Sequence, residues 1–315
     1  MIPSEYSFIR YLSSKKSVDD RALNHAVWEQ MADALPPASP GEPLHVFEAG
    51  AGIGTMLERM LERGLLRQAR FTALDAQVEN IRHTRMRLAR WGIEHGYSIA
   101  ETPKGLRFTR EGQVIDLELV AEDVFDFIQH EAGHQTWDLL VAHAFLDLLD
   151  VPAALPQLFW LLRPGGLFYF TINFDGLTAL EPHIDPIYDE SILALYHRSM
   201  DERLVDGRPS GDSRTGRHLF AQLRTAGAQV LAAGSSDWVV FADPAGYPSG
   251  HPGGYPEDEA YFLHFIINTI HLALAGHPEL DAARFQAWMA ERHAQVERGE
   301  LVYIAHQLDI LGRKS

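Results

Sequence analysis

A glycine-rich turn between an apolar strand and a helix constrains this chain more than any other feature of its sequence. Residues 46–55 read Val-Phe-Glu-Ala-Gly-Ala-Gly-Ile-Gly-Thr, so three glycines alternate with small residues directly after an apolar run. Glycine tolerates positive φ angles, and its missing Cβ leaves room for another group against the backbone. We therefore expect a strand, a tight turn on which a ligand packs, and a helix.

From residue 44 onward, short apolar runs alternate with helical stretches, which is typical of strand–helix–strand units around a parallel sheet. Strands are predicted over residues 44–48, 69–75, 115–120, 137–142, 166–172, about 229–241 and 301–308. The predicted fold is α/β, with a doubly wound, seven-stranded, mostly parallel sheet whose seventh strand is antiparallel and whose two faces carry helices.

The rest of the chain is expected to form an N-terminal segment and two insertions. Apolar residues at helical spacing predict one helix over 18–35, and the proline-rich residues 36–43 cannot continue it. Residues 1–43 are therefore expected to form a helical segment or lid before a domain of residues 44–315. Insertions are expected at about 173–216, an irregular excursion with a helix near 188–200, and at about 242–299, with helices over 257–275 and 280–297.

Composition excludes several classes of function. The formal net charge is −16, so the average surface repels phosphate backbones and anionic lipids, and neither nucleic acid nor membrane is an expected partner. The chain has no cysteine, which excludes disulfides, thiolate zinc sites and cysteine nucleophiles. No secretory signal is visible, so a cytoplasmic protein is expected. The apolar run 261–275 is too short to cross a bilayer and is interpreted as a buried helix or the contact of a homodimer.

Glu48 distinguishes between two nucleotide cofactors that the glycine turn could bind. The dinucleotide fingerprint G-x-G-x-x-G would have its third glycine where the chain has Thr55, whereas Gly54 comes one residue early. A carboxylate at the end of the strand would repel a pyrophosphate but suits a cation. Charge therefore favours the sulfonium cofactor S-adenosylmethionine, and an NAD-dependent oxidoreductase is the alternative.

The pattern Glu-x-Gly-x-Gly-x-Gly after a first strand resembles motif I of the class I S-adenosylmethionine-dependent methyltransferases. Two later runs, Trp-Asp-Leu-Leu-Val at 137–141 and Leu-Leu-Arg-Pro-Gly-Gly at 161–166, resemble the fourth and fifth blocks of that family. The resemblance covers about residues 44–175 and the terminal strand. It implies methyl transfer by in-line displacement, with S-adenosylmethionine as donor, and leaves the subfamily open.

The resemblance also implies which residues bind the donor. Asp75 would accept hydrogen bonds from both ribose hydroxyls, and Asp123, with the amide of Val124, would lie near the adenine amino group. The expected donor-binding residues are Glu48, Gly50, Ala51, Gly52, Gly54, Asp75, Ala76, Asp123 and Val124. Arg21 is added as a partner for the methionyl carboxylate, with a surface capping cluster as the alternative interpretation.

The acceptor and the catalytic groups are less constrained. His143 directly follows the fourth strand and is predicted as a general base for a hydroxyl or ammonium acceptor, with a structural histidine as the alternative. His183, Asp185 and Asp189 form no compact ligand pattern, so no metal is expected. The long first insertion favours a small-molecule acceptor. A protein that binds S-adenosylmethionine without catalysis remains a third possibility.

Overall fold

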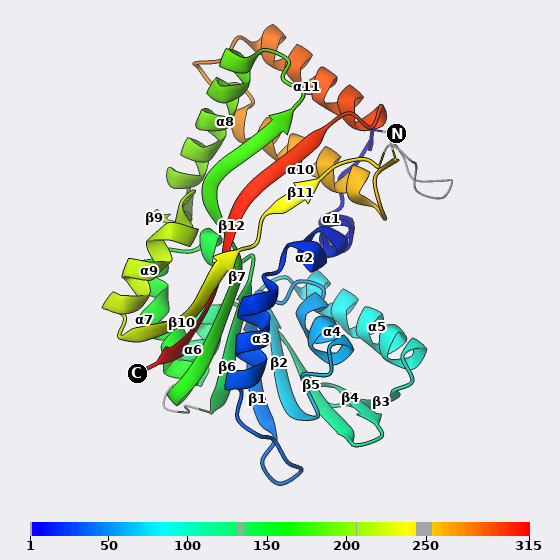
Figure 1. Ribbon diagram of the computed structural model, residues 1–315, viewed down its shortest axis with the longest axis vertical. Coiled ribbons are helices and arrows are strands. Elements are labelled where there is room, and N and C mark those ends of the chain that lie inside the picture. The colour runs from blue at the N-terminus through cyan, green and yellow to red at the C-terminus, as the bar shows by residue number, and fades with distance from the viewer. Residues whose placement is uncertain (1, 132–133, 135, 206, 244–253) are drawn as a thin grey trace.

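A mixed β-sheet organises the chain, whose computed structural model describes residues 2–131, 134, 136–205, 207–243 and 254–315 (Figure 1). Within these residues the sheet has ten strands in the order β10-β12-β7-β6-β1-β2-β5-β4-β3, with β11 paired to β12. Its central strands are parallel, and β12 runs antiparallel to both β7 and β10. The parallel strands are β1 (Leu44–Ala49), β2 (Gln68–Asp75), β5 (Gln113–Ala121), β6 (Trp137–His143) and β7 (Leu162–Glu181).

The sheet confirms the predicted α/β class and corrects the predicted number of strands. The expected sixth strand is divided into β10 (Ala228–Ser235) and β11 (Trp238–Val240), and the seventh is β12 (Val302–Lys314). The hairpin of β3 (Ser98–Thr102) and β4 (Gly105–Arg110), which extends the edge beside β5, was not predicted. Most side chains of β3 are exposed, so this hairpin has no apolar run to reveal it.

Helices cover both faces of the sheet because consecutive strand residues point to opposite faces. Val46 belongs to the core under α3 (His25–Ala34), α4 (Thr55–Glu62) and α5 (Val78–Glu94), whereas its neighbour Phe47 belongs to the opposite core. That second core lies under α6 (Val124–His130), α7 (Val151–Leu161) and α9 (Thr215–Thr225). Both faces are buried, which explains the continuous apolar runs of the central strands.

A third core lies beyond the sheet, around the long ends of β7 and β12 (Figure 1). We call this part the cap; it consists of those strand ends with α8 (Pro186–Asp201), α10 (Glu259–Leu274) and α11 (Ala282–Glu297). The predicted irregular excursion from residue 173 is wrong at its start, because β7 continues to Glu181 by pairing with β12. Residues 244–253 of the second predicted insertion lie outside the described residues.

Helix α10 corresponds to the apolar run that suggested a subunit contact. Its apolar side chains, including Phe262, Ile267 and Ile270, are buried against other parts of the same chain. Its composition is therefore explained within one chain and gives no support for a homodimer. No helix in the described part of the chain has the length and apolarity needed to span a membrane.

The N-terminal segment forms three helices where one was predicted over 18–35. Helices α1 (Phe8–Ser14) and α2 (Lys16–Ala22) precede α3, and the chain breaks at Asn24. The Asn24 side chain accepts a hydrogen bond from the amide of Val27 (3.1 Å) and donates one to the carbonyl of Ser235 (2.9 Å), while its backbone amide donates to Asp309 (2.8 Å). These contacts with the sheet override the helical periodicity.

Replacing Asn24 with alanine tests this break. Asn24→Ala removes the cap of α3 and one hydrogen bond to the sheet, so we expect a loss of about 1–2 kcal/mol in the free energy of unfolding, measured by urea denaturation. Asn268→Ala, in the middle of α10 and without a side-chain hydrogen bond to any described residue, is the control and should not destabilise. Equal stability of Asn24→Ala and the parent chain would contradict this account.

Candidate functional site

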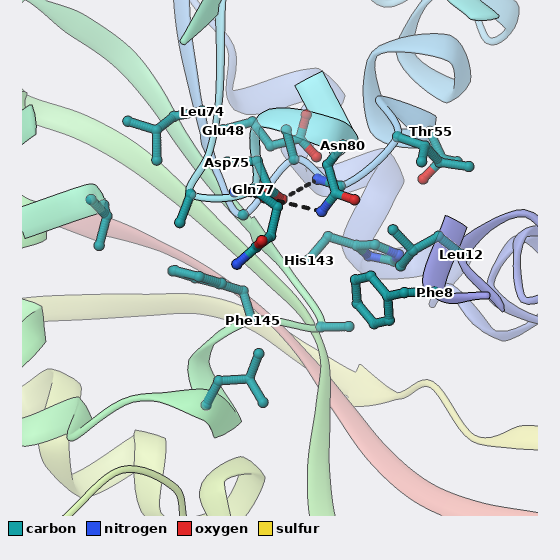
Figure 2. Close-up of a pocket in the computed structure, with 18 of the residues that line it drawn as sticks. Phe8, Leu12, Glu48, Thr55, Leu74, Asp75, Gln77, Asn80, His143 and Phe145 are labelled. Atoms are coloured by element: carbon teal, nitrogen blue, oxygen red, sulfur yellow. Dashed lines mark hydrogen bonds between the residues drawn. The ribbon is translucent and has the colours of Figure 1, made fainter. Parts of the chain in front are cut away.

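A cavity of about 260 Å³ lies where the glycine turn leaves β1, at the carboxyl ends of the parallel strands (Figure 2). Ligand crevices of doubly wound sheets lie at these ends. The cavity brings together eight of the predicted donor-binding residues: Glu48, Gly50, Ala51, Gly52, Asp75, Ala76, Asp123 and Val124. Three strand ends and the start of α6 thus meet at one site.

The glycines of the turn have different roles. Gly50 has a φ of +69°, and a Cβ there would lie 2.3 Å from Cδ2 of Phe145, a cavity-lining ring. Gly54, at a φ of +76°, caps α4, and a Cβ on it would lie 2.7 Å from Cγ2 of Thr84 on α5. Gly50 therefore keeps the cavity open, whereas Gly54, predicted to bind the donor, allows α4 and α5 to pack and does not line the cavity.

Asp75 is fixed by three donors at the end of β2 (Figure 2). Its Oδ2 accepts a hydrogen bond from the amide of Gly52 (2.9 Å). Its Oδ1 accepts from the amide of Gln77 (2.8 Å) and from the side chain of Asn80 (3.0 Å). A carboxylate has about four lone-pair sites, so one site on Asp75 is still open to a ligand, and a ligand that donates twice would displace one of these three donors. Asn80 and Gln77 also line the cavity, and nothing in the sequence pattern had singled them out.

Glu48 is a buried acid in the cavity wall. Only 2% of its surface is exposed, and its Oε2 has no hydrogen-bond partner among the described residues. Burial raises the pKa of Glu48 to about 8, with the charge of Asp75 adding to the rise and Arg59 opposing it. The side chain is therefore mostly a neutral acid at pH 7, and a cation placed in the cavity would favour its ionised form.

Asp123 caps α6 and also lines the cavity, and its predicted contact with the adenine stays a prediction. Its Oδ1 accepts a hydrogen bond from the amide of Phe125 (2.8 Å), which caps α6, and it lines the cavity beside Val124. The helix thus begins at the cavity wall, and its first turn positions the acid.

His143 lies in the cavity wall with both ring nitrogens occupied. Its Nδ1 is 2.7 Å from Oγ1 of Thr171, and its Nε2 is 3.0 Å from Oδ2 of Asp19. Burial lowers the pKa of His143 to about 4, so the ring is neutral at pH 7. Nη1 of Arg59 lies 3.3 Å from the same Nε2, so this nitrogen faces both a carboxylate and a guanidinium. Both ring nitrogens are thus held by neighbours within the cavity wall, and the general-base role predicted for His143 stays a prediction.

Asp19 joins the N-terminal helices to this wall. Besides His143, it accepts hydrogen bonds from Lys15 Nζ (2.5 Å) and from Trp238 Nε1 (2.9 Å). Burial alone would raise its pKa, but the charges of Lys15 and Arg59 and the hydrogen bond with His143 hold the pKa of Asp19 well below its usual range. Lys15 itself lines the cavity, as do Phe8 and Leu12 of α1, and none of these was predicted.

Arg21 is placed away from the cavity, in contrast to its predicted role with the donor carboxylate. Its two terminal nitrogens lie 2.6 and 2.9 Å from the carboxylate oxygens of Glu259 at the start of α10. Glu259 is fully buried and requires a cation, which explains the position of Arg21.

Asp185 and Asp189, which were considered for a metal site, lie in the cap and pair with arginine side chains. Asp185 caps α8 and pairs with Arg284 (2.6 Å). Asp189 pairs with Arg292 (2.8 Å) and lies 3.2 Å from Nδ1 of His183. These contacts connect elements of the cap, and none of the three residues lines the cavity at the glycine turn.

Two residues beside His143 adopt the left-handed conformation that non-glycine residues rarely take. Ala144 has a φ of +49° and Ile172 a φ of +57°, each directly after a member of the His143–Thr171 hydrogen bond. The amide of Ala144 donates to the carbonyl of Thr171 (2.9 Å). Such conformations cost about 1–3 kcal/mol each and cluster at functional sites. Strain is therefore concentrated where β6 and β7 reach the cavity.

Comparisons with known proteins find likeness only among solved structures. No protein-family model and no curated protein matches. A methyltransferase candidate from Bacillus halodurans C-125 is 10% identical at a TM-score of 0.49, over 92% of this chain and 99% of that chain. An S-adenosylmethionine-dependent methyltransferase from Methanosarcina mazei is 12% identical at 0.45, over 90% and 96%. Geranyl diphosphate C-methyltransferase from Streptomyces coelicolor A3(2), solved with S-adenosylhomocysteine, is 9% identical at 0.44, over 93% and 77%.

The chain is thus similar to S-adenosylmethionine-dependent methyltransferases. This is the family that its sequence motifs resemble. The ligand of the cavity is inferred from the residues that line it and not from these structures of low sequence identity.

Burial of Glu48 makes stability depend on pH. Its pKa is about 8 in the folded chain, against about 4.3 in an unfolded one, so the folded state keeps a proton that the unfolded state loses. The contribution of Glu48 to stability is therefore complete below about pH 4 and decreases as the pH rises toward 8. We expect Glu48→Gln to gain stability over the parent chain across this window, by at most about 1.4 kcal/mol per pH unit.

Urea denaturation between pH 5 and 8 measures this difference. Glu62→Gln, which replaces an exposed glutamate at the end of helix α4, is the control and should follow the parent chain throughout. If Glu48→Gln also ran parallel to the parent chain, the account of Glu48 as a buried, protonated acid would be wrong.

Proposed function

We propose that this chain is a class I methyltransferase that transfers the methyl group of S-adenosylmethionine to a small-molecule acceptor. The observation that carries the proposal is that Oε2 of Glu48 is buried without a hydrogen-bond partner among the described residues. Glu48 lines the same cavity as the glycine turn and Asp75. A glycine-lined wall admits a nucleoside, a fixed carboxylate suits its ribose, and a buried acid without a partner suits a positive charge. S-adenosylmethionine combines all three.

The residues of the cavity can be assigned to parts of this donor. Asp75 would accept the ribose hydroxyls, and Asp123 with the amide of Val124 would lie at the adenine. Glu48 would face the positively charged end. Lys15, which lines the cavity and whose ammonium is 2.5 Å from Asp19, is the cation that would meet the methionyl carboxylate in place of Arg21. When bound, the donor supplies an already activated methyl group, so that this chain has mainly to align the acceptor and exclude water.

The N-terminal helices have a part in this proposal. Phe8 and Leu12 of α1 form one side of the cavity, and a Cβ on Gly52 would lie 3.4 Å from Cδ1 of Leu12. We propose that α1 and α2 cover the bound donor. This is the role expected of residues 1–43, which were predicted to form a lid. Their apolar side chains would keep water from the methyl group.

An NAD-dependent oxidoreductase is the rival function, and its cofactor meets an unfavourable wall. A pyrophosphate on the glycine turn would approach Glu48 and Asp75, two buried acids, whereas a dinucleotide site offers free amides there. The amide of Gly52 already donates to Asp75. A cation would favour the ionised form of Glu48, whereas a pyrophosphate would oppose its ionisation, so this wall favours the sulfonium.

Calorimetric titration separates the two cofactors. We expect S-adenosylmethionine and S-adenosylhomocysteine to bind the full chain, and NADH to show no heat of binding at the same concentrations. Binding of NADH without binding of the sulfonium would overturn the proposal. If the donor binds but no acceptor in a broad panel is methylated, the chain is instead a binding protein without catalysis.

Substitution of Asp75 tests the ribose assignment. Asp75→Ala removes the carboxylate that would accept two hydroxyl hydrogen bonds, so we expect affinity for S-adenosylhomocysteine to fall by at least about 100-fold, since hydrogen bonds to a charged group contribute about 1.5–3 kcal/mol each. Asp116→Asn, on the exposed side of β5 where it pairs with Arg107, is the control and should bind normally. Unchanged affinity of a folded Asp75→Ala, verified by thermal unfolding, would refute the assignment.

A further inference from the structure

Glu48 and Asp75 are two acids of one cavity wall that are held in different ways. In the parallel pairing of β1 with β2, Glu48 is level with Ala73, so Asp75 follows two residues further along on the same face of the sheet (Figure 2). Three hydrogen-bond donors hold the carboxylate of Asp75. Oε2 of Glu48 is buried without a partner in the described part of the chain. Glu48 is therefore the acid whose ionisation a ligand can change.

Two arginines near Glu48 form their hydrogen bonds with other carboxylates. Nε of Arg59 on α4 is 2.5 Å from Asp20, and Nη1 of Arg87 on α5 donates to Glu58. The charges of both arginines favour the ionised form of Glu48, while burial opposes it more strongly. The carboxyl group is thus held as a neutral acid beside two cations that would stabilise its negative charge if a ligand shifted the balance.

The charged groups around this wall balance one another while Glu48 keeps its proton. They comprise four cations and four carboxylates: Lys15, Lys16, Arg59, Arg87, Asp19, Asp20, Glu58 and Asp75. Asp123, the remaining acid of the cavity lining, is exposed, so water screens its charge. An ionised Glu48 would add a negative charge without a counter-charge to a buried wall, which is costly.

S-adenosylmethionine and S-adenosylhomocysteine bring different net charges to this wall. At pH 7 both molecules carry a carboxylate and an ammonium group at the methionyl end. S-adenosylmethionine carries the sulfonium as well, so its net charge is one positive unit, whereas that of S-adenosylhomocysteine is zero. The donor therefore leaves a surplus positive charge beside a protonated Glu48, and the product does not. Ionisation of Glu48 restores the balance for the donor alone.

We propose that Glu48 distinguishes the methyl donor from the product, because it gives its proton to solvent when S-adenosylmethionine binds and keeps it when S-adenosylhomocysteine binds. The inference rests on the function proposed above. On donor binding the carboxyl O–H bond breaks, the proton passes to the buffer, and the carboxylate remains with the added positive charge. Methyl transfer removes the sulfonium charge, so Glu48 takes up a proton again before the product leaves.

Calorimetric titration of the full chain in two buffers measures this proton. Phosphate and Tris differ in their heats of ionisation, so the difference in observed heat at pH 7 gives the number of protons released. With a pKa of about 8, about nine in ten chains carry a proton on Glu48 at this pH. We therefore expect release of about 0.9 proton per S-adenosylmethionine bound, and of less than about 0.2 per S-adenosylhomocysteine.

The affinities should diverge as the pH rises from 5.5 to 7. Affinity for S-adenosylmethionine should increase by up to about tenfold per pH unit, since one proton is released, and affinity for S-adenosylhomocysteine should change little. The charged groups that face Glu48 are Asp75 on β2, Arg59 on α4 and Arg87 on α5, and none of them is a histidine. His143, which contacts Arg59, has a pKa of about 4, below this range.

Glu48→Gln imitates the protonated acid and locates the effect. This variant should release no proton with either ligand and should bind S-adenosylmethionine about tenfold more weakly at pH 7 or worse, with no dependence on pH. Its affinity for S-adenosylhomocysteine should stay within about threefold of the parent chain. Glu62→Gln, at an exposed position of α4, is the matched control and should release the proton as the parent chain does.

The outcomes separate this inference from the proposed function. If both ligands bind and neither releases a proton, the inference is wrong and the function stands. Equal release with both ligands would show that Glu48 responds to the ammonium group they share, which also overturns the inference. Proton release that persists in Glu48→Gln would assign it to another residue and reject the role of Glu48. If neither ligand binds, the proposed function is wrong and the inference fails with it.

Discussion

One buried carboxylate, that of Asp19, connects the parts of this molecule. It receives hydrogen bonds from Lys15 beside α2, from Trp238 in β11 and from His143 at the end of β6. These contacts come from the N-terminal helices, the cap side of the sheet and the wall of the donor cavity. An unpaired charge at this depth would cost several kcal/mol, so the three partners must be in place together. The geometry of the cavity therefore depends on the correct docking of α1 and α2.

The donor cavity illustrates which parts of a site a sequence can predict. Glu48, Gly50 and Asp75 were predicted because they occupy fixed positions relative to strand ends, and strand ends meet at one edge of a parallel sheet. Their positions after the strands, together with the resemblance to the methyltransferase motifs, were enough to place them. Lys15 and Phe8 reach the same cavity from a segment far away in sequence, and no local pattern reveals such a contact.

Arg21 and His143 show which contacts of predicted site residues the sequence does not reveal. Arg21 was expected at the cavity because it is a cation near the domain, but a buried acid on α10, Glu259, takes it. His143 was expected to act as a base because of its position after β6, and its position was right. Its chemistry depends on Thr171 and Asp19, residues 28 and 124 positions away. The fold shows this pattern as well, since parallel strands with apolar runs were predicted and the polar hairpin of β3 and β4 was not.

The long strands β7 and β12 determine whether the cap can be separated from the rest of the molecule. Their pairing runs from Leu167 with Arg313 in the central sheet to Glu181 with Val302 in the cap. The cap is thus joined to the central sheet by two strands that run through both, and their pairing shifts register twice on the way, between Ala305 and Gln307 and between Leu308 and Ile310. The cap is consequently not a module that can be exchanged between proteins by cutting at loops. A chimaera that changes acceptor preference would have to keep both strands and replace the helices that pack on them.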